Sequence, residues 1–119
     1  MAASHDFGRA CEALAAADLA RRGWTILDRN YRAGRAEIDL IARLGRTVAF
    51  IEVKGRRDTR YGDPLDAITP AKRSEIGRVA RVWLERHGRP HWHYRFDAIA
   101  VRTRAGRSVV EHVEDAWRL

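Results

Sequence analysis

Hydrophobic and polar positions divide the sequence into two helical and five extended segments. Apolar residues recur at helical spacing from Ser4, a suitable N-cap, to about Arg22, and again from Thr69 to Gly88. The segments 24–31, 36–43, 47–54, 93–102 and 109–113 alternate or are continuously apolar, which is typical of β-strands. This order predicts a single α/β domain over residues 1–119, with a mixed five-stranded sheet flanked by helices.

Glycine and proline mark the ends of these segments. Gly23 follows the first helix as a stop signal, and Thr69-Pro70 supplies an N-cap and a first helical residue for the second. Gly45-Arg46 fits a two-residue hairpin loop with glycine first, as a type II′ turn prefers. The stretch 55–66 contains further breakers and several arginines, so it is predicted to be a basic loop.

Three acids and one lysine interrupt two strands that are otherwise apolar. They are Glu37 and Asp39 in one strand and Glu52 and Lys54 in the next. A carboxylate in such a strand is costly to desolvate unless a cation compensates it. A divalent metal is the simplest compensating cation, and phosphodiester chemistry is a common use of such a metal.

The predicted hairpin brings these four residues together. If Gly45-Arg46 is the whole loop, Asp39 lies opposite Glu52 and Glu37 lies opposite Lys54, all on one face. The opposite face of the first strand would carry Ala36, Ile38, Leu40 and Ala42. Opposed residues have Cβ atoms about 4.5–5.5 Å apart, which suits two carboxylates that share one Mg²⁺. The alternative is an exposed hairpin end with ordinary cross-strand ion pairs.

The charge distribution favours a polyanionic partner. The net charge is +7, from 23 Lys and Arg against 16 Asp and Glu. Basic residues gather after the acidic strands and on the second helix: Lys54, Arg56, Arg57, Arg60, Lys72, Arg73, Arg78 and Arg81. Positive charge beside a carboxylate cluster suits a phosphate backbone delivered to a metal. The alternative is a basic surface that serves only solubility.

Other features narrow the class of protein. No apolar run approaches the roughly 18 residues of a membrane span, and the first residues lack the pattern of a signal peptide. The single cysteine, Cys11, falls on an apolar helix face and is interpreted as core. We therefore expect a cytoplasmic protein that does not contact a membrane. Glycine-rich phosphate loops and nucleophile elbows are absent from the sequence.

Three further positions carry open alternatives. His91 and His93 have a spacing that can bind zinc, but no acid or cysteine lies close in sequence. Asp97 lies in an apolar strand, where it either pairs with an arginine or supports an active site. Trp92 is the one tryptophan that we consider as a base-stacking residue, since the others are interpreted as core or interface.

The acidic strands and their surroundings resemble a known family. The segments 37–42 and 51–54 resemble the PD-(D/E)xK nuclease signature, within a restriction-endonuclease-like core. With Gly8, Glu12, the segment 27–32, Gly55, Arg56, Gly62 and Lys72, most of the chain resembles the YraN family of predicted bacterial endonucleases, which are similar to Holliday junction resolvases. One departure is Ala36, where the family usually has glycine.

The resemblance implies roles for individual residues. Asp39 and Glu52 would ligate Mg²⁺ or Mn²⁺ together with the backbone carbonyl of Val53, and Lys54 would orient the attacking water. Glu12 would approach the same site from the first helix, and Glu37 would be an accessory acid. From the charge distribution, the residues expected to contact nucleic acid are Arg56, Arg57, Arg60, Lys72 and Arg73.

The expected function is metal-dependent hydrolysis of phosphodiester bonds in branched or damaged DNA, with DNA favoured over RNA. A homodimer is one expected arrangement, because cutting both strands of a symmetric substrate needs two active sites. The alternatives are a nucleic-acid-binding module on a nuclease fold, which cleaves nothing, and a protein-interaction adaptor.

Overall fold

The computed structural model describes residues 2–57 and 62–119, which form two helices, a short 3₁₀ helix and a five-stranded sheet. The elements in chain order are α1 (Ala2–Arg21), β1 (Thr25–Ala33), β2 (Ala36–Leu44), β3 (Thr47–Arg56), η2 (Pro64–Ala67), α2 (Pro70–His87), β4 (His93–Arg104) and β5 (Arg107–Trp117). The predicted α/β fold and mixed sheet are confirmed. No described helix is long and apolar enough to cross a bilayer.

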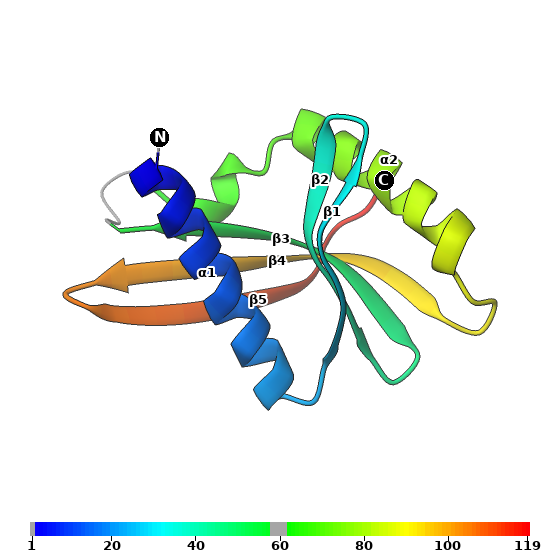
Figure 1. The fold of residues 1–119 in the computed structure, drawn as a ribbon, viewed down its shortest axis with the longest axis horizontal. Helices are drawn as coiled ribbons and strands as arrows, with labels where there is room; N and C mark the ends of the chain where they lie inside the picture. The colour runs from blue at the N-terminus through cyan, green and yellow to red at the C-terminus, as the bar shows by residue number, and fades with distance from the viewer. Residues whose placement is uncertain (1, 58–61) are drawn as a thin grey trace.

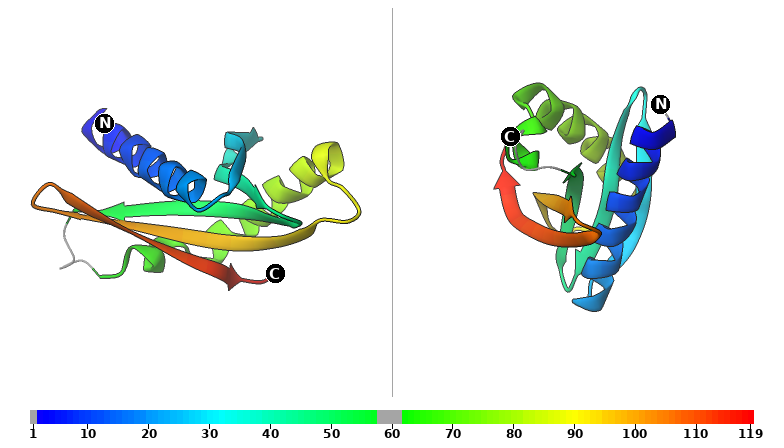
Figure 2. Two further views of the ribbon diagram at one scale, coloured as in Figure 1. Left: turned by 90° about the horizontal axis from the view of Figure 1, so that it is seen from below. Right: turned by 90° about the vertical axis from the view of Figure 1, so that its left-hand side faces the viewer.

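The sheet has the strand order β1-β2-β3-β4-β5. Strands β3 and β4 are parallel, and the other neighbouring pairs are antiparallel. The parallel pair needs a long crossover, which η2 and α2 supply (Figure 1). Helices α1 and α2 cover opposite faces of the sheet (Figure 2).

Each helix packs on its own hydrophobic core. Buried α1 residues such as Ala15 and Leu19 pack with Leu40 and Ile51 of the sheet. On the other face, α2 residues pack with Phe50, whose ring meets Trp83 edge-to-face at 5.8 Å. Cys11 is 2% exposed in the first core, as predicted.

Close packing of α1 on the sheet depends on a glycine at the end of β3. A Cβ at Gly55 would lie 2.3 Å from the Cys11 sulfur and 3.0 Å from the Phe7 ring. Gly55 therefore lets the first half of α1 approach the strand that carries Glu52 and Lys54.

The predicted boundaries shift at several elements. Helix α1 begins at Ala2, ahead of the predicted cap Ser4, while Gly23 follows the helix with φ +92°, as a stop signal requires. Thr69 caps α2 as predicted by accepting the Lys72 backbone N–H. The predicted loop 55–66 is wrong at both ends, because β3 continues to Arg56 and η2 begins at Pro64.

Candidate metal centre

The centre forms where β2 separates from β3. The predicted two-residue loop at Gly45-Arg46 is confirmed, and the ladder runs from Leu44 opposite Thr47 to Leu40 opposite Ile51. The next predicted pair, Asp39 with Glu52, does not continue the ladder. Instead, Asp39 Oδ2 accepts a hydrogen bond from the Val53 backbone N–H at 2.8 Å. The Asp39 carboxylate therefore replaces a backbone acceptor at the point of divergence.

The divergence also overturns two details of the predicted register. Glu37 does not pair with Lys54; it accepts from Arg32 of β1 at 3.1 Å. The four apolar residues predicted to share one face of β2 also divide between the cores. Leu40 and Ala42 belong to the α1 core, whereas Ala36 and Ile38 belong to the α2 core. The strand therefore twists between Ile38 and Leu40, at the position of Asp39.

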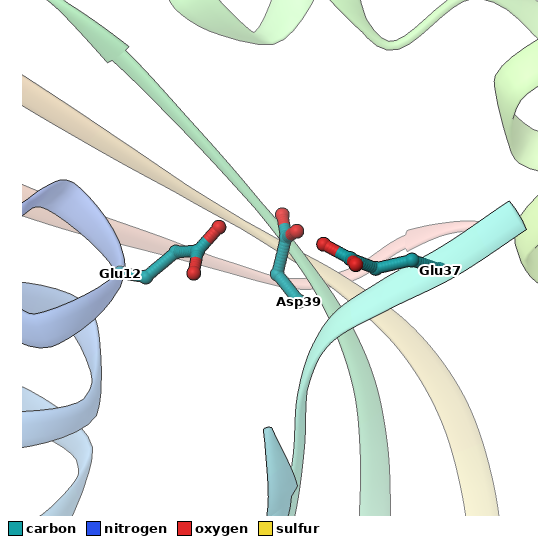
Figure 3. A group of neighbouring side chains, drawn as sticks. All are labelled: Glu12, Glu37 and Asp39. Atoms are coloured by element: carbon teal, nitrogen blue, oxygen red, sulfur yellow. The ribbon is translucent and has the colours of Figure 1, made fainter. Parts of the chain in front are cut away.

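Three carboxylates converge at this twist. Glu12 from α1 and Glu37 from β2 point toward Asp39 from opposite sides (Figure 3). One oxygen of each residue lies within 4.8 Å of the corresponding oxygens of the other two, and all three side chains are partly buried. This trio can hold a metal ion, because Mg²⁺ and Mn²⁺ prefer carboxylate oxygens.

Asn30 joins two members of the trio. Its Nδ2 donates to Glu12 Oε1 at 3.0 Å and to Glu37 Oε1 at 3.1 Å, and its Oδ1 accepts from Arg9 at 2.7 Å. Its φ of +50° is unusual within a strand but tolerated by asparagine. In the sequence, Asn30 is marked only by its place in the segment 27–32 of the family resemblance and by the rarity of asparagine in a strand interior.

Glu52 lies on β3 beside the trio and is 2% exposed. Its Oε2 is 3.5 Å from Lys54 Nζ and 3.8 Å from Lys72 Nζ. Its Oε1 is buried and has no hydrogen-bond partner within residues 2–57 and 62–119. Lys72, which the sequence placed among the nucleic-acid contacts, therefore also approaches the carboxylates from the first turn of α2.

Two of these acids, Asp39 and Glu12, have raised pKa values. Burial, followed by the negative charge of Glu52, raises the pKa of Asp39 to about 7. Burial also raises the pKa of Glu12. The hydrogen bond from Asn30 lowers this pKa, and the negative charge of Asp39 raises it. Ionisation of these acids is thus costly in the absence of a further cation, and a divalent cation would lower that cost.

The residues present fit such a cation. Asp39 and Glu52 supply adjacent carboxylates, Glu52 offers a buried oxygen that lacks a partner, and the trio provides further oxygens. Val53 is held here through its N–H group, so the ligand role of its carbonyl stays a prediction.

The basic residues around the centre have different surroundings. Arg57 lies over the Phe7 ring at 4.2 Å, and Arg56 donates to the Gly55 carbonyl. Arg73 donates to the Ile68 carbonyl and lies over the Trp117 ring at 5.6 Å. Arg60 falls outside the described residues. Their contacts with nucleic acid stay predictions.

Asp97 belongs to a separate network on β4. It is fully buried, accepts from Arg95 at 3.0 Å and from the Asp115 backbone N–H at 2.9 Å, and lies 2.7 Å from His112 Nε2. The alternative that paired Asp97 with an arginine is therefore correct. His91 and His93 do not join a metal-binding group in the described part of the chain.

The fold and the site together define an α/β protein with a partly buried acidic cluster that can hold a divalent cation. A family model described as Uncharacterised protein family UPF0102 matches residues 11–101. A UPF0102 protein of Bifidobacterium longum subsp. infantis is 43% identical over 114 residues, which cover 93% of this chain and 92% of that protein. One from Chlorobium chlorochromatii is 44% identical over 118 residues, covering 94% and 91%. One from Geobacter sulfurreducens is 42% identical over 109 residues, covering 91% and 85%. The chain belongs to the UPF0102 family, the YraN family that the sequence resembles.

Proposed function

We propose that this protein is a divalent-metal-dependent endonuclease that hydrolyses phosphodiester bonds in DNA. The observation that carries the proposal is the Glu52 carboxylate. It is buried next to Asp39, one of its oxygens has no partner in the described part of the chain, and the other faces Lys54 and Lys72. Buried acids beside lysines match a site that binds a metal and a phosphate at once.

The residues divide the chemistry between them. Asp39, Glu52 and the nearby Glu12 and Glu37 would hold Mg²⁺ or Mn²⁺, which when bound supplies Lewis-acid stabilisation and lowers the pKa of water. Lys54 has an ammonium group within reach of Glu52 and is about one-third exposed. This group would orient water and donate hydrogen bonds to the phosphate oxygens as charge develops there.

Lys72 supports the same role from the other side of Glu52. Thr69 caps α2 just before it, so the lysine stands at the positive end of the helix dipole. A phosphate near Glu52 would meet this helix end together with two ammonium groups. Branched or damaged DNA is the proposed substrate, and a homodimer would supply the second site for a symmetric branch.

The test combines metal binding with cleavage. We expect calorimetry to show Mg²⁺ or Mn²⁺ binding by the wild type and none by Asp39→Ala. On the same samples, a panel of branched, nicked and duplex DNA should be cut by the wild type alone, and only with metal.

A matched control is Glu114→Ala, because Glu114 is an exposed acid that pairs with Arg95 in the other network. Its metal binding and cleavage should equal those of the wild type. Metal binding without cleavage of any substrate would favour the nucleic-acid-binding module. A wild type that binds no metal even with DNA present would overturn the proposal.

A further inference from the structure

A hollow lies between β1 and the C-terminal end of α2. It measures about 510 Å³, within the range of small-ligand pockets, and is formed by β1, the C-terminal end of α2 and the segment before β4. Its lining includes Leu27, Asp28, Trp83, Arg86, Arg89 and Trp92. In Figure 1 the end of α2 lies on the other side of the β1–β2 hairpin from α1.

Aromatic rings form one wall of this hollow. Trp83 is buried, and its ring lies nearly parallel to that of Trp92, at an angle of 18° and a centroid distance of 6.4 Å. Trp92 is only partly buried, whereas Trp24, Trp83 and Trp117 are each no more than 6% exposed. The guanidinium groups of Arg89 and Arg43 lie 5.5 Å and 5.7 Å from the centre of the Trp92 ring. A flat ligand could extend this stack, because bases stack both on tryptophan and on arginine planes.

Polar groups beside the rings set the chemistry of the ligand. Arg86 and Arg89 are exposed at the rim and can meet a phosphate. Asp28 accepts from Trp83 Nε1 at 2.9 Å, and a carboxylate has further acceptor capacity for a base N–H. A planar ring with an attached anion fits this combination better than an apolar peptide does.

Strand β1 connects the hollow to the metal centre. A register shift at residues 26–28 turns both Leu27 and Asp28 toward α2, whereas Asn30 reaches Glu12 and Glu37. Asp28 and Asn30 are two residues apart, about 7 Å along a strand. At the far wall, Arg86 lies fourteen residues after Lys72 on α2, a rise of about 21 Å.

We infer that this hollow binds one unstacked nucleotide of a single-stranded segment that leaves the duplex near the metal centre. The inference rests on the proposed function, because it takes nucleic acid as the ligand. It narrows the substrate to DNA with an unpaired strand within about six nucleotide steps of the cleaved bond, taking 3.4 Å per step along a strand.

The experiment measures DNA binding without metal, so that cleavage plays no part. Fluorescence anisotropy of a dye-labelled short oligothymidylate and, separately, of a labelled hairpin duplex of equal charge is measured in chelator as the full chain is added. We expect the single strand to bind the wild type and to bind Trp92→Leu about tenfold more weakly. Duplex affinity should change less than about twofold.

Two further variants separate stacking from folding and from charge. Trp92→Phe retains an aromatic face and should keep most of the single-strand affinity. Arg89→Gln should weaken single-strand binding, whereas the control Arg107→Gln, at the exposed first residue of β5, should not. Circular dichroism melts establish that each variant is folded.

The outcomes distinguish this inference from the proposed function. Equal losses for single strand and duplex in Trp92→Leu, or no loss for either, would overturn the nucleotide site and leave the nuclease proposal standing. If neither DNA binds the wild type at low salt, both the nucleotide site and the nuclease proposal fail.

Discussion

Two aspartates, Asp39 partly buried and Asp97 fully buried, occupy similar backbone settings and have opposite electrostatic surroundings. Asp39 of β2 accepts the backbone N–H of Val53 on the next strand, and Asp97 of β4 accepts that of Asp115 on β5. Both lie where a strand pairing ends or shifts register. Near each is a non-glycine residue with positive φ, Asn30 at +50° and Asp115 at +51°.

The difference is the charge that surrounds each carboxylate. Burial would raise the pKa of Asp97, but hydrogen bonds from His112, the Asp115 backbone and Arg95 hold the pKa below its ordinary value. Arg22 donates to His112 Nδ1, so the His112 Nε2–H can donate to Asp97. Asp39 instead has Glu52, Glu37 and Glu12 nearby, and its pKa rises to about 7. The protein alone satisfies one aspartate, whereas the other lies in a group of acids that can hold a metal ion.

The largest expected effect is on catalysis. Asn in place of Asp39 keeps an oxygen for the Val53 N–H but removes the metal-binding charge. We expect Asp39→Asn to lower the rate of DNA cleavage by about a thousandfold or more, equivalent to about 4 kcal/mol in the barrier. Asp97→Asn should change the rate per folded molecule by less than about threefold. Single-turnover cleavage, corrected for the folded fraction, measures the rate of each variant. Equal losses of rate in Asp39→Asn and Asp97→Asn would contradict the different roles given to the two aspartates.

The next effect is on stability in the absence of metal. Asp97→Asn leaves His112 without its charged partner and Arg95 with only the exposed Glu114, which should lower the free energy of unfolding by about 3–5 kcal/mol. Asp39→Asn relieves carboxylate repulsion and should raise it by about 2 kcal/mol at pH 8. Urea unfolding in chelator gives both values. A lower melting temperature for Asp39→Asn in chelator would show that the cluster is not under repulsive strain.

The sequence predicted the parts of this contrast that depend on local pattern. The two-residue loop fixes the hairpin register as far as Leu40, and alternation brings the acids to one end of the hairpin. The divergence at Asp39 could not be predicted, because it depends on how β2 twists between the two helix layers. The approach of Lys72 to Glu52 depends on where a distant helix packs. The arginine partner of Asp97 is Arg95, two residues away on β4, whereas His112 and the Asp115 N–H come from β5 and depend on how that strand pairs.

The same contrast should be visible in the pH dependence of stability. An unfolded aspartate has a pKa near 3.8, and folded Asp39 has one of about 7, so between these values the folded state holds an extra proton. In chelator the Asp39 contribution therefore falls as pH rises from about 4 to 7, by about 2–4 kcal/mol in total. The advantage of Asp39→Asn over wild type should be near zero at pH 4 and largest above pH 7.

Asp97 has the opposite sign. Its folded pKa lies below the unfolded one, so its contribution is fully present above about pH 4 and is lost as the pH falls through the folded pKa. The penalty of Asp97→Asn should then be constant from pH 5 to 8 and shrink in stronger acid. Urea unfolding at a series of pH values tests both trends; a penalty that varies across pH 5 to 8 would indicate titration of another group.

The smallest expected effect concerns the positive-φ residues beside each aspartate. Glycine adopts φ near +50° without strain, whereas alanine pays for it, by about 1 kcal/mol. Asn30→Gly should therefore be about 1 kcal/mol more stable than Asn30→Ala, and Asp115→Gly should exceed Asp115→Ala by a similar amount. Each comparison removes the same side-chain hydrogen bonds in both variants, so the difference isolates the backbone.

Metal binding should then separate the two positions, because Asn30 holds the glutamates of the trio and Asp115 does not. Both Asn30 variants should bind Mg²⁺ or Mn²⁺ more weakly, by a similar factor, while the Asp115 variants bind as the wild type does. Calorimetry measures the metal affinity of the four variants, and urea unfolding measures their stability. If Asn30→Gly bound metal as the wild type does and Asn30→Ala did not, Asn30 would act through strand geometry and not through its side-chain amide.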